Sequence, residues 1–287
     1  MKRCPRPQAR VGSDRRLSRA LPGTHGNRYK CRAARDDVPF PQHASKHRWK
    51  PLYTALDFHR YDARRAKGRS PRFPRNVILV FGARWNRYLR RKYRGKRDPR
   101  TGVYRVAHDV GVAHLRGPGA PFTAIVAEEL AALGARSFVI VGLAGSLQPD
   151  VRLGSFVLCG RALRDEGTSH HYAKAAKFAR PTASLNRRLA KFLRERKIDF
   201  RRGATWTIDA PYRETVPEIR RFRQEGILTV EMEASALFTV ARYLRCEAAA
   251  LFVISDHLDE RGWEPLFYES HPALRRALGV AIEALSE

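Results

Sequence analysis

The stretch ILTVEMEASALFTVARYL, residues 227–244, changes character part of the way along its length. Residues 227–230 are apolar or β-branched, which predicts a short buried strand, and residues 233–244 have the apolar spacing of a helix. Glu231 and Glu233 stand where the strand passes into the helix. In open α/β sheets, ligands bind outside the carboxyl ends of the strands. This junction therefore predicts both an α/β fold and the place of its functional site.

The same alternation of strands and helices runs through most of the chain. Short apolar runs predict buried strands at residues 77–81, 137–142, 155–159 and 248–255. Amphipathic segments predict helices at residues 122–133, 185–196, 214–224 and 272–285. We therefore predict an α/β fold, a single-domain three-layer α/β/α sandwich around a mixed, largely parallel twisted sheet.

Positive charge is concentrated in two parts of this chain of 287 residues, whose formal net charge is +28. Residues 1–75 carry a net charge of +16 and residues 84–105 a net charge of +9. We predict that residues 1–74 form a basic, mainly disordered N-terminal extension and that residues 75–287 form the folded domain. The extension is either an arm for nucleic acid or an Arg-rich addition without a function of its own.

The chain shows no feature of a membrane or secreted protein. Its apolar runs are too short to span a bilayer, and we expect no secretory signal at the basic N-terminus. The cysteines have no spacing typical of a zinc site or a disulfide framework; they are Cys4, Cys31, Cys159 and Cys246. We therefore expect a cytoplasmic protein without a metal site.

Three further stretches place carboxylate, hydroxyl or imidazole groups next to apolar strands. They are RDEGTSHHY at residues 164–172, WTIDAPYRET at residues 206–215 and ISDH at residues 254–257. Together with VEMEAS at residues 230–235, they resemble the nucleoside phosphorylase superfamily, which includes purine and uridine phosphorylases and related nucleosidases. The resemblance implies that residues 75–287 form a nucleoside phosphorylase-like catalytic domain.

The resemblance implies a sugar site at the strand–helix junction. It assigns ribose binding to Glu231, Met232 and Glu233, and a carboxylate is a strong acceptor for the vicinal hydroxyls of a sugar. The structural alternative is that both glutamates stabilise the first turn of the helix through its dipole. His170 and His171 are expected at a subunit contact or at the edge of the site.

The base is expected to contact residues of the other two motifs. The resemblance assigns base binding to Thr207, Arg213 and Asp256, and it makes Arg213 and Asp256 the catalytic residues. A carboxylic acid at Asp256 would protonate a departing purine, whereas a cation at Arg213 would stabilise a departing uracil anion. Pro211 stands where the uridine phosphorylases have a glutamine, so the choice between purine and uridine stays open.

The phosphate site departs from the pattern of the superfamily. Its usual Arg and its usual Ser or Thr correspond here to Ile140 and Leu143. A phosphate dianion needs charge-assisted donors, so other cations must supply them or water must be the nucleophile. The candidates lie in the glycine turns at residues 82–87 and 117–121 or directly before them; they are Gly82, Arg84, Arg87, Arg116 and Gly119.

These features predict a nucleoside phosphorylase, closest to the uridine-phosphorylase-like branch. We expect no metal and no organic cofactor, with inorganic phosphate as co-substrate, and a homo-oligomer that is a dimer or a hexamer. The first alternative is a hydrolytic nucleosidase of the same fold, favoured by Ile140 and Leu143. The second is a nucleic-acid-binding protein on an inactive scaffold, although we expect neither a nucleic acid nor a membrane as partner.

Overall fold

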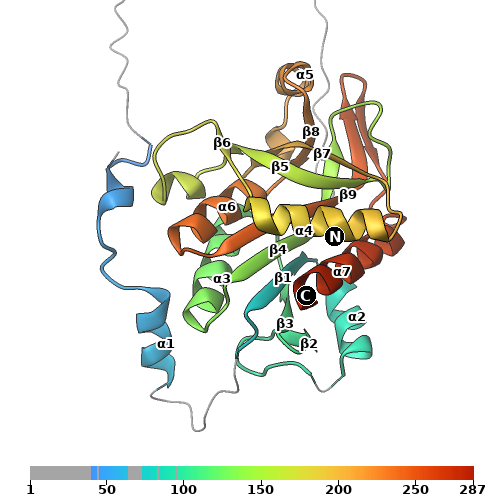
Figure 1. Ribbon diagram of the computed structural model, residues 1–287. Helices are drawn as coiled ribbons and strands as arrows, with labels where there is room; N and C mark the ends of the chain where they lie inside the picture. Colours follow the sequence, from blue (N-terminus) through green and yellow to red (C-terminus); the bar gives the residue numbers. More distant parts are fainter. Residues whose placement is uncertain (1–39, 44, 64–72, 83, 95) are drawn as a thin grey trace, which may run out of the picture. The chain divides into compact units, whose positions relative to one another are not determined.

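The computed structural model describes residues 40–43, 45–63, 73–82, 84–94 and 96–287. These residues belong to one compact unit, which extends from Pro39 to Glu287 (Figure 1). Residues 1–39 of the predicted extension lie outside the described part of the chain. The domain boundary at residue 75 stays a prediction, although the compact unit begins well before it.

The strands form one mixed sheet in the order β10-β9-β5-β7-β8-β4-β1-β3-β2, with β6 beside β5. Their bounds are Asn76–Phe81 (β1), Tyr104–Ala107 (β2), Val110–Leu115 (β3), Ser137–Ser146 (β4), Phe156–Asp165 (β5), Phe178–Ala179 (β6), Phe200–Ile208 (β7), Ile227–Glu231 (β8), Glu247–Asp259 (β9) and Gly262–Pro265 (β10). β1 runs parallel to β3 and β4, and β4 runs parallel to β9. The carboxyl ends of these four strands therefore lie at one edge of the sheet.

Part of this sheet closes on itself. β4 pairs with β9 on one side and, at its end, with β8 on the other side, where Gly145 lies opposite Val230. β9, β5, β7 and β8 pair in succession, so these strands and β4 form a closed ring. A Cβ atom on Gly145 would lie 2.4 Å from Leu258 Cδ1 and 3.0 Å from Asp256 Oδ2. Glycine at this position thus allows β9 to approach β4 closely beside Asp256.

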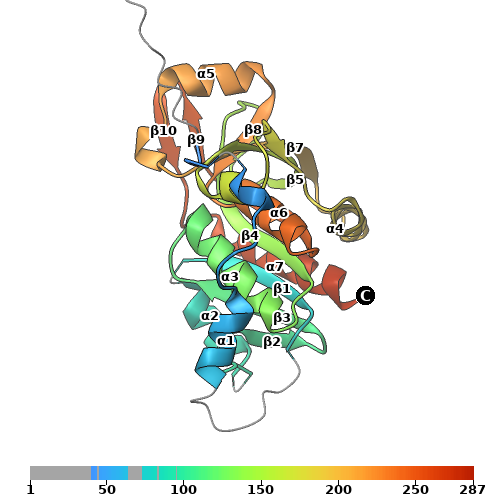
Figure 2. The same cartoon turned by 90° about the vertical axis from the view of Figure 1, so that its left-hand side faces the viewer.

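Helices cover the sheet on both faces. α3 (Ala120–Ala132) and α6 (Ala234–Tyr243) lie on one face, and α2 (Arg84–Lys92), α4 (Ala183–Glu195) and α7 (His271–Ser286) lie on the other (Figures 1 and 2). This arrangement confirms the predicted three-layer sandwich. None of the helices in the described residues is both long enough and apolar enough to cross a membrane.

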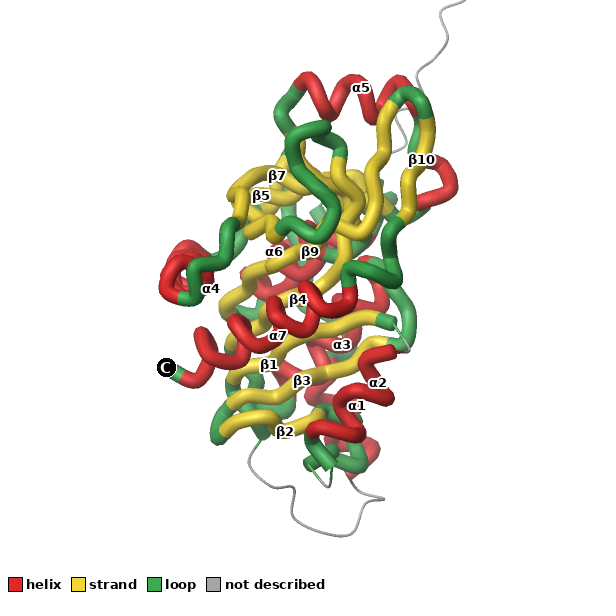
Figure 3. The backbone as a smooth tube through the Cα atoms, turned by 90° about the vertical axis from the view of Figure 1, so that its right-hand side faces the viewer, coloured by secondary structure: helices red, strands yellow, loops and turns green. Residues whose placement is uncertain are grey.

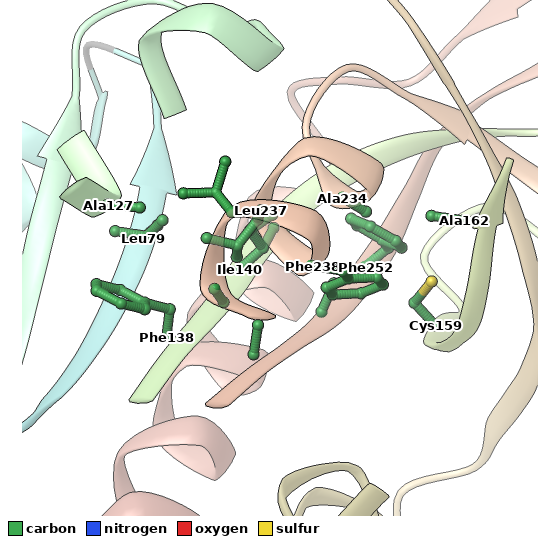
Figure 4. Packing of buried hydrophobic residues seen from close by; sticks show 14 of the residues in the cluster. Leu79, Ala127, Phe138, Ile140, Cys159, Ala162, Ala234, Leu237, Phe238 and Phe252 are labelled. Atoms are coloured by element: carbon green, nitrogen blue, oxygen red, sulfur yellow. The ribbon is translucent and has the colours of Figure 1, made fainter. Parts of the chain in front are cut away.

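Alternate residues of β1 show why both faces are covered. Leu79 belongs to the same buried cluster as Ala127 of α3 and Leu237 of α6 (Figure 4). Ile78 belongs instead to the cluster that contains Leu89 of α2 and α7 residues. Because successive side chains of a strand point to opposite faces, a run of apolar residues such as VILVF needs a hydrophobic layer on each side.

The remaining helices lie around this sandwich. α1 is Ala55–Ala63, α5 is Val216–Gln224, and short 3₁₀ helices cover Lys46–Arg48, Thr168–His171 and Pro211–Arg213. The helix predicted at residues 214–224 begins at Val216, because Thr215 and Glu218 form a capping box. Pro217 stands in its first turn, where a missing N–H costs little.

Residues of the predicted extension contact the domain. His59 Nε2 of α1 lies 3.1 Å from the carbonyl oxygen of Glu129 on α3. Nearer the start of the described part, Lys46 Nζ lies 3.0 Å from His171 Nδ1, and the Phe40 ring packs edge-on against the rings of His170 and His171. The segment therefore joins α3 to the loop that follows β5.

These contacts predict different behaviour for two shortened chains. A chain that begins at Pro39 is expected to keep the Tm and activity of the full chain. A chain that begins at Arg75 is expected to fold with a lower Tm, since α3 loses its contacts with α1, among them the one between His59 and the carbonyl oxygen of Glu129. Differential scanning calorimetry of both chains measures the difference. An equal Tm would mean that residues 40–63 add no stability.

Candidate active site

The carboxylate of Glu231 is fully engaged at the start of α6. Its Oε2 accepts the backbone N–H groups of Glu233 and Ala234, both at 2.8 Å. Its Oε1 accepts the hydroxyl of Thr207 at 2.5 Å and that of Thr205 at 3.4 Å. The negative charge thus lies at the positive end of the helix, where free N–H groups need acceptors. The observed contacts of Glu231 are therefore those of a glutamate that stabilises the first turn of the helix. Its contact with ribose stays a prediction.

Glu233 has a different set of contacts. Its Oε1 accepts the N–H of Gly119, just before α3, at 2.6 Å. The backbone N–H of Met232 also favours the charged form of this carboxyl group and works against the rise of its pKa. The side chain is 6% exposed, and Met232 beside it is half-buried. Glu233 is therefore a carboxyl group in a nearly dry environment, where a hydrogen bond from a ligand hydroxyl is strong.

Burial of the two carboxylates changes their protonation. The pKa of Glu233 is raised, first by burial and then by the negative charge of Glu231. The pKa of Glu231 is also raised by burial, and its hydrogen bonds with Thr207 and the backbone oppose that rise. Two neighbouring buried carboxylates favour a state in which they share a proton. A polyhydroxylated ligand is well suited to such a pair, because hydroxyl groups both donate and accept.

The motif at residues 164–172 connects β5 to the same helix. Glu166 Oε1 accepts the hydroxyl of Ser235 on α6 at 2.7 Å, and its Oε2 accepts the N–H of Ser169 at 2.9 Å. Arg164 Nε donates to Ser169 Oγ at 2.8 Å. These buried contacts fix the loop against the start of α6, next to the glutamate pair.

The two histidines of this motif lie at its outer side. His170 and His171 are half-buried, and both rings pack against Phe40. Burial and the nearby charge of Lys46 lower the pKa of His171. Their predicted place at a subunit contact or the edge of the site stays a prediction.

Asp256 lies near the end of β9, opposite Gly145. Its Oδ1 accepts the hydroxyl of Ser255 at 2.6 Å, and its Oδ2 accepts the indole N–H of Trp263 at 2.9 Å. Trp263 belongs to β10, which folds back on β9 as a hairpin. The carboxyl group is 7% exposed and is oriented by two donors, one on each oxygen.

A second carboxyl group accompanies Asp256. Glu214 follows the short helix Pro211–Arg213, and burial raises its pKa to about 7, with smaller contributions from the charges of Asp256 and Glu218. A group with this pKa holds or releases a proton near neutral pH. Glu214 is not among the residues predicted from the sequence, although it belongs to the motif WTIDAPYRET at residues 206–215.

The other two residues predicted to bind the base lie in different surroundings. Arg213 is exposed, and it neighbours Glu214 in sequence. Thr207 is buried; its hydroxyl donates to Glu231 and accepts the N–H of Ser235 at 3.1 Å. Thr207 thus connects β7 to the glutamate pair, and its contact with a base stays a prediction.

The two glycine turns predicted to hold phosphate lie side by side. Gly82, after β1, donates its N–H to the carbonyl oxygen of Leu115 at 3.2 Å. Arg116 follows Leu115 and is exposed, and the turn continues to Gly119, which contacts Glu233. Arg84 begins α2, and Arg87, one turn further, is exposed. The structure therefore brings Gly82, Arg116 and Gly119 together at the carboxyl edge of the sheet.

Ile140 and Leu143 are apolar neighbours within β4. Ile140 is completely buried in the cluster between the sheet and helices α3 and α6 (Figure 4). Leu143 is half-buried and packs against the cluster on the other face. Neither side chain supplies a donor for an anion, so the departure seen in the sequence is also present in the structure.

Comparison with known proteins agrees with this geometry. Residues 91–285 match the phosphorylase superfamily. A DeoD-type purine nucleoside phosphorylase from Exiguobacterium sibiricum is 28% identical over 225 residues, which cover 77% of this chain and 89% of that protein. A uridine phosphorylase from Treponema pallidum is 29% identical over 180 residues, 59% of this chain and 69% of that protein.

The fold is also similar to that of a phosphorylase whose structure has been solved. The crystal structure of a uridine phosphorylase from Vibrio fischeri superimposes with a TM-score of 0.57 and 25% identity, covering 73% of this chain and 90% of that chain. The matched residues contain the glutamate pair, Glu214 and Asp256. This chain belongs to the phosphorylase superfamily.

Proposed function

We propose that this enzyme is a nucleoside phosphorylase, which cleaves the N-glycosidic bond of a nucleoside with phosphate and releases a free base and a pentose 1-phosphate. The observation that carries the proposal is the buried carboxyl group of Glu233, which accepts the N–H of Gly119 and lies next to the carboxylate of Glu231. A nucleoside sugar presents vicinal hydroxyls that suit this carboxyl group.

The sugar side of the reaction depends on the glutamate pair. Cleavage of an N-glycosidic bond builds positive charge on the sugar ring. A carboxylate at Glu233 that binds the sugar hydroxyls lies close to that charge and stabilises it more than it stabilises the neutral substrate. Glu231 positions Glu233, because it accepts the backbone N–H of Glu233.

The base side depends on the groups near the ends of β7 and β9. A purine leaves most readily when a ring nitrogen is protonated, and a uracil leaves as an anion spread over its carbonyl oxygens. Asp256 and Glu214 are candidate proton donors, and Arg213 is a candidate cation. The proposed substrate is uridine-like or a purine nucleoside, with a slight preference for uridine from the resemblance of its motifs.

The nucleophile requires a cation that neither Ile140 nor Leu143 supplies. Of the three arginines predicted for this role, we propose Arg116, because its turn also contains Gly119, which touches Glu233. Arg84 is the second candidate, at the start of α2. The backbone N–H groups of the glycine turns would add further donors to the phosphate.

Base release in the presence and absence of phosphate tests the proposal. With inorganic phosphate, each base released should be accompanied by one pentose 1-phosphate, and removal of phosphate should lower the rate at least about tenfold. Arg116→Ala should raise the KM for phosphate about tenfold more than the KM for nucleoside, whereas Arg180→Ala, at another exposed position, should change neither. Chromatographic product analysis over a panel of nucleosides measures all of these values.

The alternative is a hydrolytic nucleosidase, and the apolar Ile140 and Leu143 favour it. Base release at an undiminished rate without phosphate, with free pentose as the product, would establish that activity instead. A chain that cleaves no nucleoside of the panel would favour a nucleic-acid-binding protein on an inactive scaffold.

The finer properties of the enzyme belong to the same proposal. We propose that it is cytoplasmic, that it needs no metal and no organic cofactor, and that it assembles as a dimer or a hexamer. Exposed apolar side chains near α1 and α3, including Leu52, Tyr53 and Ile125, are candidates for the contact between subunits.

A further inference from the structure

A cavity lies between α2 and α7, away from the glutamate pair. Its volume is about 770 Å³, within the range of cavities that bind small ligands. The residues that line it include Trp85, Arg87 and Arg91 of α2 and Arg275 of α7. Figure 3 shows both helices on the near face of the sheet.

This cavity is on the opposite face of the sheet from the proposed active site. Trp85 of α2 and Leu274 of α7 belong to the buried cluster that contains Ile78. Glu233 contacts Gly119 at the start of α3, and α3 and α6 pack on the cluster of Leu79. Ile78 and Leu79 are consecutive on β1, so their side chains point to opposite faces. The cavity is therefore on the other face of the sheet from the glutamate pair, although Arg87, one of the arginines predicted to hold phosphate, also lines it.

The side chains that line the cavity carry positive charge from several arginines. Across the part of the chain that the structure describes, no carboxylate lies within ion-pair distance of Arg87, Arg91 or Arg275. The 16-residue helix α7 begins here, and its first turn contains no acidic residue. Three guanidinium groups and a helix N-terminus together favour an anion, most of all one with several acceptor oxygens.

A buried donor without a partner points to a bound group. Trp85 is 4% exposed, it lines this cavity, and its indole Nε1 is buried with no hydrogen-bond partner among the described residues. A buried N–H without an acceptor costs free energy, and a ligand oxygen would remove that cost. Because Trp85 lines the cavity together with the arginines, we expect the acceptor of its N–H to be anionic.

Aromatic rings complete the lining. Tyr88 packs edge-on against Trp85 with ring centroids 5.6 Å apart, and the Arg275 guanidinium lies 5.6 Å from the Tyr88 ring centroid. Tyr268, before α7, also lines the cavity. Aromatic rings next to guanidinium groups are typical of sites that hold a planar base together with a phosphate.

We propose that the α2–α7 cavity is a second ligand site, which binds a nucleotide through its phosphate. The phosphate oxygens accept hydrogen bonds from Arg91, Arg275 and the indole N–H of Trp85, and the base lies against Tyr88 and Tyr268. The cavity is much larger than a single phosphate, and its rings would have no role for an inorganic anion. The ligand contacts proposed here leave out Arg87, which is also a candidate for the phosphate of the reaction.

The test measures nucleotide binding by isothermal titration calorimetry on the full chain, with adenosine 5′-monophosphate and uridine 5′-monophosphate as probes. Arg91→Ala/Arg275→Ala should weaken binding at least about tenfold, the scale of one charge-assisted hydrogen bond. Trp85→Phe, which keeps a ring but removes the N–H, should weaken it several-fold. Arg187→Ala/Arg194→Ala removes the same charge from exposed positions of α4 and should leave binding unchanged.

The proposal also requires that catalysis stay intact. In nucleotide-free buffer, Arg91→Ala/Arg275→Ala should keep the kcat/KM for nucleoside and the KM for phosphate of the wild-type chain. A raised KM for phosphate would make the cavity part of the catalytic anion site and would overturn the second site. A chain that fails in the nucleosidase and phosphorylase assays but binds the nucleotides as described would overturn only the proposed function.

Other outcomes would overturn the choice of ligand. Equal loss of binding in both double variants would show a general charge effect. Inorganic phosphate that binds as tightly as the nucleotides would show that no base is recognised. A neighbouring cavity of about 700 Å³ shares Arg87 and Arg91 and adds Arg90, Arg94 and Arg97. Single-stranded oligonucleotides that bind far more tightly than mononucleotides would therefore indicate an extended nucleic-acid surface instead.

Discussion

Asp256→Asn is expected to lower kcat/KM for a 6-oxopurine nucleoside by about two orders of magnitude, the usual scale of general acid catalysis. The change removes the exchangeable proton and keeps the size of the side chain. It should also keep the fold, because an Asn oxygen can accept the Trp263 N–H while its amide donates to the Ser255 hydroxyl. Steady-state kinetics with inosine and with uridine, together with the Tm of the variant, measure the effect.

The same pair of measurements identifies the leaving base. If uridine is the substrate, Asp256→Asn should matter little, and Arg213→Ala should be the damaging change. Trp263→Phe is the matched control for Asp256→Asn. It removes the donor to Asp256 Oδ2 but leaves the carboxyl group unchanged. Should neither Asp256→Asn nor Arg213→Ala alter the cleavage of any nucleoside, the base does not bind between these residues.

Glu233→Gln is expected to lower kcat/KM at least about tenfold, since it removes one charge-assisted contact with the sugar. The same substitution should raise the stability of the protein at alkaline pH. An amide oxygen still accepts the N–H of Gly119, and the cost of a buried charge next to Glu231 disappears. A loss of activity together with a gain in stability is typical when a buried carboxylate that serves function is replaced.

The sign of the pH effect follows from the raised pKa of Glu233. Between the ordinary value of 4.5 and the raised value, the folded protein binds a proton that the unfolded chain releases. Stability from this group is therefore complete below pH 4.5 and falls as the pH rises through the folded pKa. The gain in Tm of Glu233→Gln over the wild-type chain should be absent below pH 4.5, grow as the pH rises through this window, and level off above the folded pKa.

Glu231→Gln is the matched control for this prediction. Its Oε2 accepts two backbone N–H groups and its Oε1 accepts two threonine hydroxyls, so an amide would place donors against donors. This variant should lose stability by about 1–3 kcal/mol, the cost of leaving buried donors unpaired. Equal changes in Tm for both glutamine variants would contradict the different roles of the two glutamates.

The sequence was informative where one local pattern determined one element. The runs at residues 77–81 and 137–142 became β1 and part of β4, and the strand–helix junction at residues 227–244 became β8 and α6. Apolar residues in these segments need burial on both faces, and only a layered α/β fold supplies it. The glutamate pair lies where the junction predicted it.

Features that depend on distant pairings could not be predicted. The run at residues 248–255 extends to Asp259 and returns as β10, because pairing with β4 and β5 supports a longer strand than its apolar part suggests. The contact of Trp263 with Asp256 follows from that hairpin. Glu214 acquires its raised pKa only when the fold buries it, with a smaller contribution from the charge of Asp256.

The closed ring of strands has a consequence for self-association. Backbone groups at an open sheet edge are templates for pairing with another chain, and a ring removes such edges from its members. The path of the described sheet ends instead at β2 and β10, which are both short. β10 begins with Gly262 at positive φ and ends with Pro265, which has no N–H to donate. A chain rich in apolar strands thereby presents little template for fibrillar aggregation.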